Sequence, residues 1–228
     1  MVRLTPEQAD EYEELGFVVI DAPWAPQLTE ECLAATALLQ SAATPEEVAE
    51  IDTIGNHWRL KPITPGSYWS AVDHSLPYLS IITHPEVVEI GQQLAGDDNV
   101  WVRNAGLNEL APGRGIFWHH DGGDDTVEFM HYPQGATKEN GCLRVIPGSH
   151  KGPTVARTAA EALEQGTTEY DELLQEIRTA EGVAKPTLRD GPEDVAMPGE
   201  VFVEVRPDQL LVRSTRIFHA TMFNRTPE

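Results

Sequence analysis

The second half of the sequence alternates short apolar segments with turn-forming residues, and this alternation restricts the fold more than any other feature. The segments are rich in valine, isoleucine, leucine and aromatic residues, which favour β-strands. Pro112-Gly113, Gly122-Gly123 and Pro147-Gly148 mark turns between them. Closely spaced short strands are typical of a compact sandwich or barrel. The expected strands are residues 100–102, 107–110, 116–119, 127–131, 143–146, 201–205 and 210–218.

Residues 1–95 show mainly helical patterns instead. Thr5 suits an N-cap, Pro6 the first helical position and Gly16 a helix end, so we expect a helix there and then a short strand at residues 17–20. Further helices are expected at residues 26–39, from residue 44 and from residue 83. The sequence therefore predicts an α+β protein, mainly β with packed helices and with an N-terminal helical segment.

The chain is long enough for one domain, which we expect to span residues 1–228. Its 228 residues are 40% apolar, which is enough for a full hydrophobic core. In the expected β core, residues 100–228, the segment 155–196 interrupts the strand pattern. Long insertions between strands are often lids or binding loops, so we expect this one to cover the mouth of an active site.

Acidic residues outnumber basic residues by 37 to 16, which gives a net charge of −21. A surface of this charge repels polyanions and argues against nucleic acid as a partner. The N-terminus has no apolar signal region, and no apolar run reaches the length of a membrane span, so we expect a soluble cytoplasmic protein without a membrane partner. Cys32 and Cys142 are too few for a disulfide framework.

The segment His119-His120-Asp121 is the best candidate for a metal site. Alternate residues of a strand face the same side about 6 to 7 Å apart, so His119 and Asp121 can reach one metal while His120 faces away. Two histidines and one carboxylate suit non-heme Fe(II). His219, which ends an apolar run, and His150, which closes a Pro-Gly-Ser-His turn, compete for the third position. Taken alone, His119 also fits a core histidine and Asp121 a turn residue.

Several blocks of the sequence resemble the phytanoyl-CoA dioxygenase family. They are Trp118–Asp121, Thr137–Lys151 and His219–Thr221 with Asn224, and Thr5–Ile20 extends the likeness over nearly the whole chain. The resemblance implies a double-stranded β-helix (jelly roll, cupin-like) that uses Fe(II), 2-oxoglutarate as co-substrate and dioxygen. It also implies that His119, Asp121 and His219 are the metal ligands and that the turn at His150 is structural.

The resemblance further suggests contacts to the co-substrate. Thr221 follows His219 by two residues, on the same strand face, and is expected to hydrogen-bond a carboxylate of 2-oxoglutarate. Arg103 and Asn108 flank the strand before the metal pair and are candidates for its other end, although Arg103 also fits a solvated surface charge.

One feature departs from the family. Its anchoring arginine lies about eleven residues beyond the late histidine, which here is past Glu228. We expect the polypeptide to continue beyond residue 228, with Arg225 as the alternative anchor.

The implied reaction is hydroxylation of an unactivated C–H bond in a small-molecule metabolite. An acyl-CoA substrate is not favoured, because the sequence has no basic cluster for a nucleotide tail. One alternative is an iron-dependent halogenase, which in related enzymes needs a small residue in place of Asp121. The others are a different oxidative tailoring enzyme and a non-catalytic jelly-roll binding protein.

Overall fold

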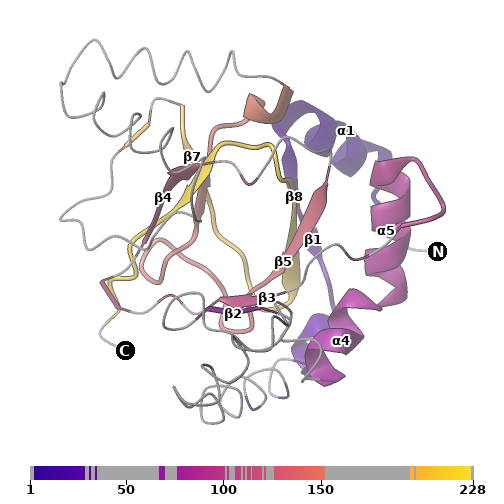
Figure 1. Ribbon diagram of the computed structural model, residues 1–228, viewed down its shortest axis with the longest axis horizontal. Helices are drawn as coiled ribbons and strands as arrows, with labels where there is room; N and C mark the ends of the chain where they lie inside the picture. Colours follow the sequence, from indigo (N-terminus) through magenta and orange to yellow (C-terminus); the bar gives the residue numbers. More distant parts are fainter. Residues whose placement is uncertain are drawn as a thin grey trace, which may run out of the picture.

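Antiparallel sheets form the framework of the protein in the computed structural model (Figure 1). One sheet has three strands in the order β1 (Phe17–Asp21), β8 (Gln209–Ser214), β5 (Val127–His131). Another has four, in the order β4 (Ile116–His119), β9 (His219–Thr221), β6 (Leu143–Val145), β7 (Val201–Val203). A short pair joins β2 (Ser67–Trp69) to β3 (Gly106–Asn108). The structure describes residues 3–28, 31, 34, 67–69, 76–100, 102, 106–108, 110, 112–113, 115–119, 121, 126–151, 196–197 and 199–226.

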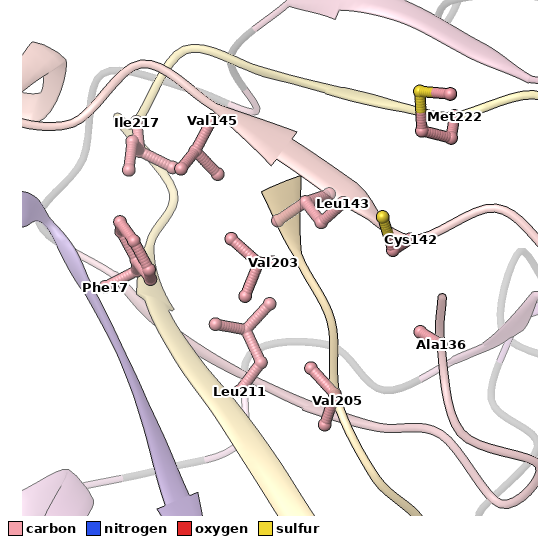
Figure 2. Close-up of a cluster of buried hydrophobic side chains, with 10 residues drawn as sticks. All are labelled: Phe17, Ala136, Cys142, Leu143, Val145, Val203, Val205, Leu211, Ile217 and Met222. Carbon is pink, nitrogen blue, oxygen red and sulfur yellow. The ribbon is translucent and has the colours of Figure 1, made fainter. Parts of the chain in front are cut away.

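Strand β8 shows why the two larger sheets and the helices form layers. Successive side chains of a strand point to opposite faces. Leu211 therefore packs between the sheets, together with Leu143 and Val145 of β6 and Val203 of β7 (Figure 2). Its neighbours Leu210 and Val212 face the other way and pack with residues of α5. The three-stranded sheet is thus buried on both faces, and one face looks into the space between the sheets.

Helices α1 (Pro6–Leu15), α4 (Leu76–Ile82) and α5 (Pro85–Ala95) lie along the outer side of the three-stranded sheet (Figure 1). The predicted start of α1 is confirmed: the Thr5 hydroxyl accepts from the Gln8 N–H at 3.2 Å, and the Gln8 side chain accepts from the Thr5 N–H at 3.0 Å. Gly16 ends the helix with φ 84°. Among the helices in the described ranges, none is long and apolar enough to cross a membrane.

The structure corrects several expected elements. Residues 100 and 102 are not in a strand, and β3 ends at Asn108, before Leu110. The expected strand at residues 210–218 ends at Ser214 as β8, and β9, which begins at His219, lies in a different sheet. Ser214 causes the break, because its hydroxyl accepts from the Arg216 N–H and its carbonyl from the Ile217 N–H, which closes a turn. The expected helix from residue 44 and the insertion 155–196, apart from Ala196, lie outside the described residues.

Candidate metal centre

The pairing of β4 with β9 brings the two expected histidine ligands to adjacent positions. His119 lies directly opposite His219, and Ile116 lies opposite Thr221. The four residues 116–119 of β4 are therefore matched with the three residues 219–221 of β9, which is a β-bulge. Directly opposed residues of an antiparallel pair share one face of the sheet, with Cβ atoms about 4.5 to 5.5 Å apart. Bulges of this kind often redirect a side chain beside a functional site.

This shared face is the one that looks toward the three-stranded sheet. On its other side His219 is paired with Val145, whose side chain belongs to the core between the sheets. Trp118, next to His119 in β4, is buried on the opposite side, where it stacks on Phe218 with ring centroids 5.5 Å apart. The alternation of β4 thus places position 119 on the inner face.

Asp121 approaches His219 although it lies beyond the end of β4. Its N–H donates to the Thr215 carbonyl at 3.0 Å, which ties it to the turn between β8 and β9. Its Oδ2 lies 3.5 Å from Nε2 of His219. Two ligands with bonds of about 2.1 Å to one metal lie about 3.0 to 3.4 Å apart, so this pair has the separation that a shared metal requires with little movement. The expected strand at residues 116–119 is confirmed as β4, but the strand alternation used to place Asp121 does not apply, because Asp121 lies at a bend beyond the strand end.

The surroundings of His219 select the nitrogen that can bind a metal. His219 is 3% exposed, and its Nδ1 lies 2.9 Å from the Ile217 carbonyl. A carbonyl oxygen only accepts, so Nδ1 carries the hydrogen and donates. In the neutral ring the lone pair is then on Nε2, the atom that faces Asp121. Metal-binding histidines usually have such a partner on the other nitrogen.

The Pro-Gly-Ser-His turn supports the backbone beside His219, and its histidine contacts α1. The Ser149 hydroxyl accepts from the Phe218 N–H at 2.8 Å, which fixes the backbone next to His219. His150 points elsewhere: its Nε2 lies 3.1 Å from the Glu13 carbonyl at the end of α1. Of the two candidates for the late ligand, only His219 approaches Asp121.

Arg213 and Glu128 are site residues that the sequence interpretation missed. Arg213 is 2% exposed, and its Nη2 donates to Oδ2 of Asp121 at 2.5 Å and also to Oε2 of Glu128. Burial lowers the pKa of Arg213, but the charges of Glu128 and Asp121 outweigh it, so its pKa is raised and the guanidinium stays charged. An arginine at the end of the apolar run Leu210-Leu211-Val212 was the available signal, because an isolated charge in a buried strand needs a partner.

Of the remaining predicted site residues that the structure describes, Thr221 lies beside this cluster, and Asn108 and Arg225 lie in other parts of the fold. Thr221 lies in β9 on the same face as His219, opposite Leu143. Asn108 is at the end of β3, paired with Ser67 in the separate two-stranded sheet. Arg225 follows the end of β9, is exposed, and its N–H donates to the Glu139 carbonyl at 2.7 Å. Arg103 lies outside the described residues.

Among the side chains that the structure describes, no three His, Cys, Asp or Glu residues come together as a metal site. The backbone of His119 is placed in β4, but its side chain is not among those described. The described part of the centre is therefore a two-residue arrangement, His219 with Asp121, to which the strand pairing adds position 119.

Comparison with known proteins agrees with this architecture. A family model described as phytanoyl-CoA dioxygenase (PhyH) matches residues 12–228. The chain belongs to this family. Among curated proteins, none matches the sequence.

Solved structures that resemble this PhyH-family protein show the same fold at low sequence identity. EctD from S. alaskensis, crystallised with 2-oxoglutarate and 5-hydroxyectoine, has a TM-score of 0.64 and 18% identity, with 98% of this chain and 72% of that chain covered. The non-heme α-ketoglutarate-dependent carbocyclase SnoK from nogalamycin biosynthesis has a TM-score of 0.55 and 17% identity, covering 99% and 80%. The epimerase SnoN, crystallised with Fe³⁺, α-ketoglutarate and nogalamycin RO, has a TM-score of 0.52 and 16% identity, covering 97% and 78%.

Proposed function

We propose that this protein is an Fe(II)- and 2-oxoglutarate-dependent oxygenase that hydroxylates an unactivated C–H bond of a small molecule. The observation that carries the proposal is the approach of Asp121 to Nε2 of His219 at 3.5 Å, beside the directly opposed position of His119. Two imidazoles and one carboxylate on one side of a metal leave positions for a co-substrate and dioxygen. The structural relatives that contain 2-oxoglutarate support the same co-substrate here.

In this proposal His119, Asp121 and His219 hold the metal. When bound, Fe(II) and 2-oxoglutarate supply the oxidation of a C–H bond by dioxygen, with release of succinate and carbon dioxide. Thr221 lies on the same face as His219, where its hydroxyl would donate to a carboxylate of bound 2-oxoglutarate. The buried side chains between the sheets, such as Val145 and Ile217, exclude water from the reacting groups.

We also propose that the three- and four-stranded sheets are the two sides of a double-stranded β-helix. Two facing sheets with a shared apolar core, and the described helices α1, α4 and α5 on the outer side of the three-stranded sheet, support this architecture (Figure 1). Residues 1–228 then form a single oxygenase domain. Within it, we propose that residues 155–196 cover the active-site mouth and select the substrate.

Hydroxylation is preferred to halogenation because Asp121 is present and held close to His219. A carboxylate in this position occupies the coordination site that a halide would need. The structural relatives include a carbocyclase and an epimerase, so product analysis decides the reaction type. Incorporation of label from ¹⁸O₂ into the organic product, in addition to succinate, is expected for hydroxylation, whereas cyclisation and epimerisation leave the organic product unlabelled.

The first prediction tests the metal ligands. His219→Ala is expected to lose Fe(II), and Asp121→Ala to lose succinate formation, because each removes one of three ligands. Anaerobic Fe(II) titration and succinate assays on the purified variants provide the measurements. Asp10→Ala, which removes an exposed carboxylate on α1, is the matched control and is expected to behave like the wild type. Full iron content in His219→Ala would show that the metal is held elsewhere.

A further inference from the structure

Arg213 lies on the inner face of β8, beside the proposed metal centre. It follows Leu211 by two residues and therefore shares its face, toward the core between the sheets. Its side chain is 3% exposed. A charged group that is so deeply buried is costly unless it is paired, so the partners of Arg213 indicate what it does.

Two carboxylates hold this guanidinium. Nη2 donates to Asp121 at 2.5 Å and to Glu128, which lies directly opposite Arg213 across the pairing of β5 and β8. Nη1 lies 3.3 Å from Nδ1 of His219. That contact is a hydrogen bond only in the tautomer in which Nδ1 accepts, because a guanidinium has only donors; the tautomer that donates from Nδ1 to the Ile217 carbonyl does not form it.

The shared nitrogen places the two carboxylates close together. Asp121 Oδ2 and Glu128 Oε2 both accept from Nη2, so these oxygens lie within two hydrogen-bond lengths of each other. A divalent cation bound to Asp121 would attract the second carboxylate strongly. If Glu128 also bound the metal, it would occupy a position that the co-substrate needs.

We propose that Arg213 is a positioning residue that restricts the metal centre to one carboxylate. It orients Asp121 through Oδ2 and retains Glu128 in an ion pair away from the metal. The inference rests on the proposed function, since it takes Asp121 and His219 as metal ligands. Arg213 and Glu128 together carry no net charge, so the pair does not change the net charge of the groups around the metal.

The test is a double-mutant cycle with Arg213→Met and Glu128→Gln, in which Co(II) affinity of the purified metal-free protein is measured by calorimetric titration. In the wild-type background Glu128→Gln is expected to change the affinity only about threefold, because Glu128 is not a ligand there. In the Arg213→Met background the same change is expected to weaken Co(II) binding at least about tenfold more, because Glu128 has then become a ligand. Arg213→Met combined with Glu128→Gln is expected to bind Co(II) at least about tenfold more weakly than Glu128→Gln alone, since Asp121 loses its outer partner.

Equal effects of Glu128→Gln in both backgrounds would overturn the inference, because Glu128 would then act only through its charge. Equal Co(II) affinities of the double variant and Glu128→Gln would show that Arg213 does not orient Asp121. A purely structural role would lower thermal stability without this non-additive change in affinity, so melting curves are recorded for each variant. If Arg213→Met does not fold, Arg213→Lys replaces it in the cycle. In the Arg213→Lys background, Glu128→Gln is expected to weaken Co(II) binding at least about threefold more than in the wild-type background, because an ammonium lacks the planar fork that holds two carboxylates.

His219→Ala distinguishes a failure of the proposed metal centre from a failure of the role proposed for Arg213. Unchanged Co(II) affinity in this variant overturns the metal centre and the inference with it. Lost Co(II) affinity in His219→Ala, together with an additive cycle, leaves the metal centre in place and rejects only the role of Arg213.

Discussion

At the scale of single residues, two hydrogen bonds fix the structure around His219, and in each of them a donor has a defined acceptor. The Ile217 carbonyl fixes the tautomer of His219, and the Ser149 hydroxyl fixes the N–H of Phe218. The contact from Ser149 could not be assigned from the sequence, because it joins two segments that are 69 residues apart and meet only in the folded chain. The spacing of His119 and Asp121 was visible in the sequence, and so was the strand position of His219.

Arg213 and Glu128 show where prediction from the sequence fails. Their contact depends on the register between β5 and β8, which places these two residues directly opposite each other. Register is set by side-chain patterns on both strands and by packing on both faces, so it cannot be derived from either segment alone. An isolated charge in an apolar run indicates that a partner exists but does not identify it.

Gly16 provides a prediction at this scale. It adopts φ 84°, and a Cβ built there would lie 2.4 Å from Nδ1 of His150. Gly96 also ends a helix with positive φ, 64°, but has nothing within 4 Å. Gly96→Ala should therefore cost only the backbone penalty of about 1–2 kcal/mol. Gly16→Ala should lower the free energy of unfolding by about 1–3 kcal/mol more, because the side chain is also overpacked.

Urea unfolding of both alanine variants measures this difference. Gly16→Ala with His150→Ala serves as the relief variant, in which the clash is removed. Equal losses for Gly16→Ala and Gly96→Ala would mean that His150 moves aside without cost.

At the scale of elements, β8 is the strand on which most of the packing depends. It pairs with β1 on one side and β5 on the other, and it contributes to both hydrophobic clusters. The sequence predicted its apolar character but joined it to β9, since the turn that separates them contains neither glycine nor proline. The helix α4 was missed although Pro77 in its first turn was a possible start signal.

Leu211→Ala tests the importance of β8. Leu211 is fully buried between the sheets, and removing such a side chain costs about 2–5 kcal/mol because the cavity closes only partly. Val201→Ala, at a β7 position that is 41% exposed, is the control and should change stability by about 0.5 kcal/mol or less. Chemical denaturation of the two variants gives both values. Similar losses at the two positions would indicate that β8 does not have this central role.

At the scale of the whole molecule, the dominant property is charge. The chain has 37 acidic and 16 basic residues, so even complete pairing leaves 21 acidic residues in excess. Their mutual repulsion destabilises the compact state and is screened by salt. The melting temperature is therefore expected to rise between about 10 mM and about 150 mM NaCl. Calorimetry at several salt concentrations measures it, with sucrose as a control for osmotic effects. A melting temperature that falls over this range would indicate that attractive ion pairs dominate.

The short connection between β8 and β9 has a consequence for how this protein can change over evolutionary time. Only four residues, 215–218, separate a strand of one sheet from a strand of the other. Inserting or deleting one residue here would either be absorbed in the turn or shift the register of β9 by one residue, and such a shift would turn position 219 away from the interior. Selection therefore acts on the length of this connection as well as on its residues. Drift in the sequence of these four positions is tolerated wherever the turn survives, but a change in their number that shifts the register would separate His219 from His119 in a single step.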